Sequence, residues 1–164
     1  MSLIYKSKRV GKNGVPFDMF KFKTLQDNVD KISSFATDEQ YTRFGKFLRK
    51  TKIDELPQLW NVVKGDMRIF GYRAEEEKTF KVLPEAIKSI LTREKPGIID
   101  LSSLAFMDEE ELLKLGDAHE TYWMKVRPLK FTLQAFYIEN RSWLLNSAIV
   151  YIYLKKMLWS LIKK

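Results

Sequence analysis

The sequence lacks cysteine and contains a single histidine, His119, among its 164 residues. The absence of cysteine excludes disulfide bonds and thiolate metal sites, and it is compatible with a reducing cytoplasmic setting. A catalytic triad that uses histidine as its base is a poor candidate with only one histidine available. We expect His119 to be structural or to lie on the surface.

Long uninterrupted apolar runs are also missing. The longest apolar stretch covers residues 143–162, and a membrane-spanning helix needs about 20 predominantly apolar residues with few charges. Residues 1–12 are polar and basic, which excludes a signal peptide there. We therefore expect the C-terminal stretch to lie at an interface rather than to cross a membrane. Polar residues interrupt it at Asn146, Ser147, Lys155 and Lys156.

The balance of charge is basic, with a formal net charge of +8. Such an excess favours an anionic partner, which could be a phosphate-bearing substrate, an acidic lipid or nucleic acid. The basic residues are dispersed among acids and no nucleic-acid motif is present, so we rank nucleic acid last and expect no such partner. The hydrophobic fraction of 45% is sufficient for one folded domain, which we expect to span residues 1–164.

Residues 4–10 and 16–23 have the pattern of two strands, joined by the turn sequence of residues 11–14. Helical patterns follow over much of the chain, and Ser142 is a suitable N-cap for the last helix. The predicted fold class is α+β and helix-dominated, with a small β-hairpin or sheet and several helices. We expect the C-terminal helices to be amphipathic and to face a membrane. Predicted helices cover residues 37–49, 54–64, 74–82, 84–93, 108–116 and most of 118–162.

Lys21 and Lys23 lie two residues apart in the second predicted strand, so their side chains share one face. Two ammonium groups with this spacing could grip a diphosphate from one side. The alternative is a solvated edge whose lysines discourage aggregation, and local pattern alone favours this alternative.

Two adjacent carboxylates, Asp54 and Glu55, stand where a helix is expected to begin, since Pro57 suits only a first helical turn. A carboxylate at a helix N-terminus is stabilised in its ionised form, and the same place attracts phosphate. An ionised carboxylate beside a phosphate site could act as a nucleophile toward phosphorus. The simpler alternative is that both residues cap an ordinary amphipathic helix.

Basic residues crowd just ahead of this pair, including Arg49. They could neutralise an anionic substrate or simply complement the end of the preceding helix, whose buried face we expect to contain Phe44, Phe47 and Leu48. Three acids at residues 75–77 have the pattern of a solvated first turn, and Asp100 that of a capping or loop residue.

The C-terminal helix mixes tryptophan, tyrosine and lysine, which suits a membrane–water boundary. Its lysines give no clean polar face. Packing against another helix or against a partner in a homodimer is therefore an alternative.

Seven segments of the chain match the motifs of one known family in their order and together cover nearly the whole chain. They are residues 10–17, 20–24, 42–50, 54–59, 61–67, a Pro-Gly-Ile-Thr-like loop at 95–103, and 137–142. The family that they resemble is the bacterial sugar transferases, the monotopic phosphoglycosyl transferases that start polysaccharide assembly.

The resemblance implies an enzyme that transfers a sugar 1-phosphate from a UDP-sugar to polyprenyl phosphate at the cytoplasmic face of the bacterial inner membrane. It implies that Asp54 is the nucleophile, forming an acyl phosphate, and that Glu55 holds Mg²⁺. Lys21, Lys23, Arg49 and Arg73 would balance phosphate charge. Supporting roles fall to Gln58 in the same motif and to Asp66, which we expect to orient a basic residue.

The chain departs from the family in three places. The family has Gly-Pro-Arg-Pro at residues 71–74, where this chain has Gly-Tyr-Arg-Ala and loses two fixed φ angles. Lys23 replaces an arginine. The family has an apolar re-entrant helix ahead of the first strand, and this sequence shows none before residue 4, either because it is truncated or because the anchor is missing. In both cases we expect weak turnover with a lipid acceptor. A docking module of the same fold with weak or no turnover is therefore the alternative function.

Overall fold

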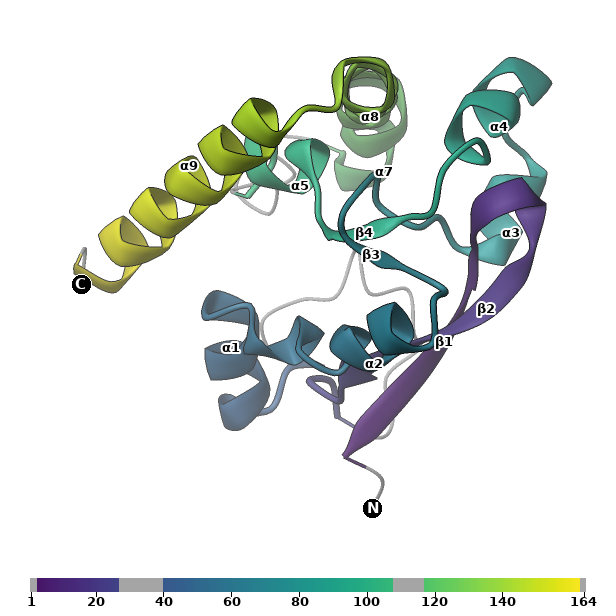
Figure 1. Ribbon diagram of the computed structural model, residues 1–164. Coiled ribbons are helices and arrows are strands. Elements are labelled where there is room, and N and C mark those ends of the chain that lie inside the picture. Colours follow the sequence, from purple (N-terminus) through teal and green to yellow (C-terminus); the bar gives the residue numbers. More distant parts are fainter. Residues whose placement is uncertain (1–2, 27–39, 108–116, 163–164) are drawn as a thin grey trace.

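The computed structural model describes residues 3–26, 40–107 and 117–162 (Figure 1). Helices dominate it, and two small sheets complete it, which confirms the predicted α+β class. The elements are β1 (Ile4–Val10), η1 (Lys12–Gly14), β2 (Pro16–Phe22), α1 (Arg43–Lys50), η4 (Ile53–Glu55), α2 (Gln58–Val63), β3 (Arg68–Phe70), α3 (Glu77–Lys81), α4 (Glu85–Leu91), β4 (Gly97–Ile99), α5 (Leu101–Ala105), α7 (Ala118–Thr121), the π-helical η5 (Tyr122–Val126), α8 (Arg127–Asn140) and α9 (Trp143–Ile162).

β1 and β2 form the predicted antiparallel hairpin, with Tyr5 opposite Lys21 and Arg9 opposite Phe17. The connecting turn requires positive φ angles, which Asn13 (58°) and Gly14 (76°) supply. Because opposed residues of a pair project to the same face, this register determines which β1 side chains lie beside Lys21.

α1 begins later than predicted, at Arg43, where the Thr42 hydroxyl accepts a hydrogen bond from the Gly45 amide at 2.8 Å. The start predicted at residue 37 lies outside the described residues. The predicted buried face is wrong for Phe44 and Phe47, which are 64% and 54% exposed, whereas Leu48 is buried. Gly45 causes this rotation, because its backbone packs so tightly on Thr24 that an added Cβ would lie 2.1 Å from the Thr24 carbonyl oxygen.

β3 and β4 form a short parallel pair at the centre of the molecule, with Arg68 opposite Gly97 and Phe70 opposite Ile99 (Figure 1). The two backbones touch where Gly71 meets Gly97. A Cβ added to Gly97 would lie 2.1 Å from the Gly71 nitrogen, and one added to Gly71 would lie 2.5 Å from the Gly97 nitrogen. Only glycine permits this approach, which brings the segment after β3 next to the start of α5.

The acidic run at residues 75–77 is not a solvated first turn, because α3 starts only at Glu77. Glu75 instead forms an ion pair of 2.7 Å with Arg127 of α8, and its side chain is 15% exposed. Glu76 accepts a hydrogen bond from Arg9 of β1 at 2.9 Å. The run therefore ties the segment after β3 to the hairpin and to α8.

α8 and α9 close the fold over α5. Pro128 stands at the start of α8, directly after η5, and the Ser142 hydroxyl caps α9 as predicted by accepting from the Leu145 amide. Ile149 of α9 is 1% exposed and packs with Leu104 of α5 and Tyr137 of α8. The helix predicted at residues 108–116 lies outside the described residues.

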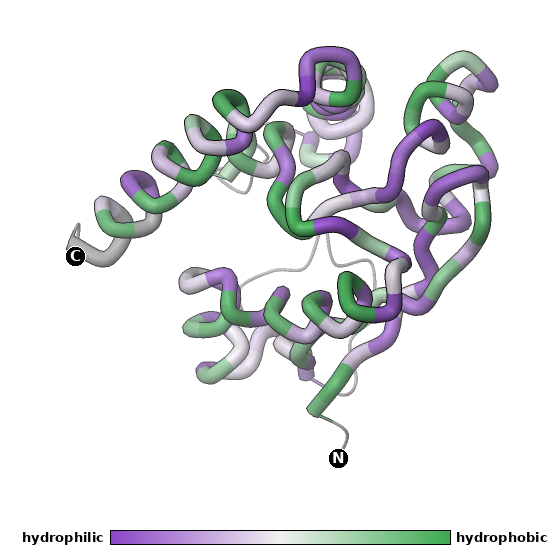
Figure 2. Tube along the Cα trace, viewed as in Figure 1, coloured by the Kyte–Doolittle hydropathy of each residue, from purple (hydrophilic) through white to green (hydrophobic). Residues whose placement is uncertain are grey.

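Apolar residues recur along the whole of α9 (Figure 2), and its lysines define no clean polar face. One face packs on the core, and the other exposes large apolar side chains. No helix in the described part of the chain combines the length and apolar character needed to cross a membrane. The exposed residues, each between 43% and 73% exposed, are Trp143, Leu144, Tyr151, Ile152, Leu154, Leu158 and Trp159.

We predict that Gly97→Ala destabilises the fold by about 3 kcal/mol or more, because the added methyl meets backbone on the opposite strand and the strands must separate. Chemical denaturation of both proteins would measure the difference. Gly14→Asn is the matched control, since its site is open and asparagine tolerates the left-handed conformation. Equal stability of Gly97→Ala and the parent would show that the contact is not tight.

Candidate active site

Asp54 and Glu55 lie in a tight turn between α1 and α2 rather than at the start of an α-helix. Lys52 has a left-handed backbone (φ 56°), which redirects the chain into the 3₁₀ turn η4. Pro57 is the N-cap of α2, so that helix begins only at Gln58. A non-glycine residue held in this conformation is uncommon, and such strain is concentrated at functional sites.

Glu55 is held by two cations from distant segments. The Lys21 ammonium lies 2.8 Å from Glu55 Oε1, and Arg73 Nη2 lies 3.3 Å from the same oxygen. The side chains of Lys21 and Glu55 are only 17% and 13% exposed. Burial works to raise the pKa of Glu55, but the charges of Lys21 and Arg73 outweigh it and hold this pKa below its ordinary value. The solvated-edge alternative is therefore wrong for Lys21.

Asp54 is 7% exposed, and its Oδ1 has no hydrogen-bond partner among the described residues. Burial raises the pKa of the Asp54 carboxyl above its ordinary value, and the charge of Glu55 acts in the same direction. Lys21, Lys52 and Arg49 offset part of that rise. The two adjacent carboxylates thus have opposite properties: Glu55 is paired and strongly acidic, whereas Asp54 is unpaired and less acidic than usual.

A cavity of about 120 Å³ opens beside Asp54. Lys21 and Lys23 of the hairpin and Arg49 of α1 line it, so three of the four predicted phosphate-binding residues gather at one hollow. The fourth, Arg73, is not among the lining residues and is connected to the others by its ion pair with Glu55. Alternation along β1 also brings Tyr5, Ser7 and Arg9 to this cavity, and the hairpin register could have identified them.

Asp66 and Gln58 stand behind the site. Asp66 Oδ2 accepts from Asn61 Nδ2 at 3.2 Å, and Asn61, fully buried, also donates to the Asp18 carbonyl and accepts from the Phe20 amide. Asp66 therefore supports, through Asn61, the strand that carries Lys21. The basic residue that Asp66 itself contacts is Lys64, whose Nζ lies 3.5 Å from Asp66 Oδ2. Gln58 is 2% exposed, and its side-chain amide nitrogen has no partner in the described residues.

Arg73 is well anchored despite the two missing prolines. Tyr72 and Ala74 on either side of it are 2% and 3% exposed, and they lie in different hydrophobic clusters. The Tyr72 carbonyl accepts from the Gly97 amide at 2.9 Å, and the Ala74 carbonyl accepts from Arg9 Nη1 at 3.2 Å. Side-chain burial and backbone hydrogen bonds thus replace the fixed φ angles of proline.

α9 packs against α5, whose Ser103 contacts Arg73. Burial, together with the charges of Glu55 and Asp100, raises the pKa of Tyr153, a residue of α9 that the sequence patterns assigned to a membrane boundary and not to the site. Asp100 is the predicted cap: its Oδ1 accepts from the Ser103 amide at 2.8 Å at the start of α5.

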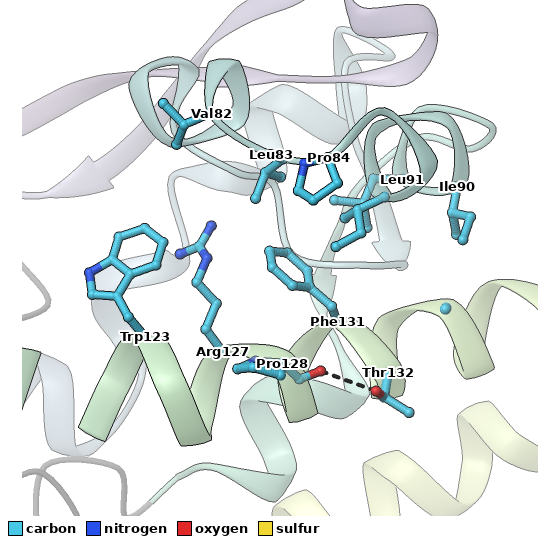
Figure 3. A pocket seen from close by; sticks show the side chains of 12 residues that line it. Val82, Leu83, Pro84, Ile90, Leu91, Trp123, Arg127, Pro128, Phe131 and Thr132 are labelled. Carbon is cyan, nitrogen blue, oxygen red and sulfur yellow. Dashed lines mark hydrogen bonds between the residues drawn. The ribbon is translucent and has the colours of Figure 1, made fainter. Parts of the chain in front are cut away.

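A larger cavity of about 540 Å³ lies between α4 and the η5–α8 segment, and apolar side chains dominate its lining (Figure 3). Arg127, the one cation among the described residues that line it, stands between the rings of Trp123 and Phe131 at 4.7 and 4.9 Å, and Glu75 already neutralises it. None of the predicted site residues lines this cavity. Its neutral, apolar surface is unsuited to a diphosphate. We therefore place the candidate site at the smaller cavity beside Asp54, although the apolar cavity has the larger volume.

The donor set at Asp54 and Glu55 fits a magnesium ion that arrives with a diphosphate. Mg²⁺ is usually bound by one or two carboxylates plus substrate phosphates and keeps several waters. Asp54 Oδ1 is a buried carboxylate oxygen in need of a partner, and Glu55 is adjacent. The described residues contain no group of three or more His, Cys, Asp or Glu side chains able to hold a metal ion, so the protein alone would not form a closed metal cage.

Comparison with known proteins identifies the class. The model of the family described as "Bacterial sugar transferase" matches residues 1–160, so the chain belongs to this family. This agrees with the resemblance inferred from the sequence motifs.

Individual relatives are between 31% and 40% identical to the chain over the regions that align. The uncharacterized sugar transferase EpsL of Bacillus subtilis is 32% identical over 161 residues, 96% of this chain and 71% of EpsL. The galactosyl transferase CpsE of Streptococcus agalactiae is 31% identical over 79% of this chain and 33% of CpsE. A UDP-glucose:undecaprenyl-phosphate glucose-1-phosphate transferase of Caulobacter vibrioides is 40% identical over 62% of this chain and 40% of its own length. The chain thus spans less than half of two of these relatives.

The raised pKa of Asp54 predicts that Asp54→Asn stabilises the protein at neutral pH. Ionised Asp54 is disfavoured in the folded state, and this cost is complete above the raised pKa and absent below the ordinary value of 3.8. The gain should therefore shrink as the pH falls from the raised pKa toward 3.8. Denaturant titrations of both proteins from pH 7 to pH 3 would measure it.

Asp18→Asn is the control with the opposite sign. The hydrogen bond from Lys8 lowers the pKa of Asp18, so this variant should lose stability at neutral pH. A difference between Asp54→Asn and the parent that does not change with pH would contradict the raised pKa of Asp54.

Proposed function

We propose that the chain transfers a sugar 1-phosphate from a UDP-sugar to polyprenyl phosphate through a phosphorylated Asp54, at the cytoplasmic face of the bacterial inner membrane. Family membership and the names of several relatives support a transferase of this kind. The observation that carries the proposal is the buried Asp54 carboxylate, whose Oδ1 has no partner among the described residues and lies beside a cation-lined cavity.

In the first step an Asp54 oxygen attacks the β-phosphorus of the UDP-sugar. A carboxylate–phosphorus bond forms, the bond to the bridging oxygen breaks, and UMP leaves with that electron pair. Lys21, Lys23 and Arg49 bind the phosphate oxygens of the donor, and the strongly acidic Glu55 stays ionised to hold Mg²⁺. When bound, Mg²⁺ neutralises diphosphate charge and polarises the phosphoryl oxygens.

In the second step a phosphate oxygen of polyprenyl phosphate attacks the same phosphorus. The Asp54–phosphorus bond breaks, and the Asp54 carboxylate is restored. The site can therefore serve a soluble donor and a lipid acceptor in turn. Arg73, which retains 38% exposure while it pairs with Glu55, is available to the phosphate groups of either substrate.

The exposed apolar side chains of α9 support binding to a membrane surface as part of this function. A second set on α1 and α2 has the same character, with Phe44 and Trp60 at 64% and 60% exposure. A lipid acceptor requires that the enzyme bind the membrane surface. The apolar side chains of these helices and the lysines beside them would make that contact.

Replacing the nucleophile tests the reaction. In detergent with Mg²⁺, a UDP-sugar panel and polyprenyl phosphate, Asp54→Asn should lower the rate of UMP release by more than about 10⁴-fold, because no covalent intermediate can form. Without acceptor, the parent should retain a sugar phosphate on the peptide that contains Asp54, which mass spectrometry would detect. Asp18→Asn is the control carboxylate variant and should keep parental rates. UMP release by Asp54→Asn at the parental rate would overturn the mechanism.

The membrane contact is tested on α9. Trp159→Glu should weaken binding to vesicles with anionic lipid by about tenfold or more, because the variant loses a large apolar contact and gains a repulsive charge. Ser89→Glu on the exposed side of α4 adds the same charge away from this surface and should bind as the parent does. Co-sedimentation would measure both. If Trp159→Glu instead dissociates a dimer without changing vesicle binding, α9 packs against a second copy.

A further inference from the structure

We infer that Ser103, at the start of α5, is a positioning residue that aims the Arg73 guanidinium at Glu55 and the phosphate site, an inference that rests on the function proposed above. Arg73 makes two directed contacts with its two terminal nitrogens. Nη2 faces Glu55 Oε1 at 3.3 Å, and Nη1 donates to the Ser103 hydroxyl oxygen at 3.2 Å. The guanidinium group is planar, so two contacts on different nitrogens fix its orientation as one contact could not.

Ser103 is itself fixed by a buried network. Asp100 Oδ1 accepts from the Ser103 amide at 2.8 Å and also from the Ser102 hydroxyl. Gln134 Nε2 of α8 reaches the same Ser102 hydroxyl at 3.4 Å. Asp100, Ser102 and Gln134 are 1%, 0% and 2% exposed, so water cannot easily rearrange these contacts. The Ser103 hydroxyl is therefore presented from a rigid turn.

The charge of this network acts on Arg73 as well. The charge of Glu55 raises the pKa of Arg73, and Asp100 contributes in the same direction. Asp100 thus has two effects: it caps α5, which places the Ser103 hydroxyl, and it adds negative potential behind the guanidinium. Arg73 is oriented between a carboxylate in the site and a carboxylate behind it.

The segment of residues 95–103, which contains β4 and the start of α5, consequently positions Arg73 in two ways. Its Gly97 contacts Gly71 and donates to the Tyr72 carbonyl at 2.9 Å, which fixes the backbone beside Arg73. Its Ser103 fixes the end of the Arg73 side chain. This one segment thus positions both the main chain and the guanidinium of Arg73.

A double-variant cycle tests this inference. Ser103→Ala should lower kcat/KM for UMP release by about tenfold, the size expected for losing a hydrogen bond to a charged group. In an Arg73→Ala background, the same change should cost almost nothing, because there is no guanidinium left to orient. Ser103→Thr keeps the hydroxyl and should restore most of the rate. Ser89→Ala, which removes a hydroxyl bonded only to the Ala86 carbonyl, is the matched control.

A readout without turnover separates this inference from the proposed reaction. The guanidinium NMR signals of Arg73, assigned with Arg73→Lys, should show hindered rotation in the parent and in Ser103→Thr but faster rotation in Ser103→Ala. If the parent releases no UMP with any donor, the proposed function fails, and these signals alone decide the positioning role. Unchanged signals in Ser103→Ala, or an equal kinetic cost in both Arg73 backgrounds, would overturn the inference.

Discussion

The buried ion pair between Lys21 and Glu55, extended by Arg73, is the interaction on which the site depends. It joins three segments that are far apart in sequence: the hairpin, the η4 turn and the segment after β3. Desolvating such charges is costly, and removing one partner of a buried pair typically costs about 3–5 kcal/mol because a charge is left uncompensated. The fold supports this cluster by fixing each of its backbones separately: Asn61 holds β2, Lys52 turns the chain into η4, and Gly97 holds the segment after β3.

The same cluster gives two neighbouring carboxylates different properties. Lys21 and Arg73 satisfy Glu55, so that carboxylate remains ionised and held in place. Asp54, one residue earlier, is buried with an unpartnered oxygen and a raised pKa. A fully hydrogen-bonded carboxylate would have to break contacts before attacking phosphorus, whereas Asp54 Oδ1 has none to break in the described structure. The buried, ionised Asp54 carboxylate thus destabilises the folded protein. In the function proposed above, a bound substrate and its cation would offset this cost.

Local patterns were sufficient for the hairpin and for the caps at Ser142 and Asp100, because turn and cap chemistry acts over a few residues. They drew attention to the pair Asp54–Glu55 but placed it at the start of an α-helix, whereas it lies in the η4 turn. They failed where a tertiary contact decided the outcome. Phe44 and Phe47 face outward because Gly45 must pack against Thr24, and Glu75 is buried because Arg127 pairs with it across 52 positions. The contact between Arg73 and Ser103 could not be predicted either, since it depends on the Gly71–Gly97 approach that brings α5 to the segment after β3.

That approach also explains how the chain can place Arg73 without the prolines of its family. Proline restricts φ locally and independently of the rest of the protein. Here Tyr72 is held by Leu83 and Leu91, and Ala74 by Phe17, Met19 and Met67, so the restriction comes from two sections of the core. A local constraint has been exchanged for a tertiary one. The orientation of Arg73 is therefore coupled to packing in both clusters, and the geometry of the site is only as rigid as the core on either side of Arg73.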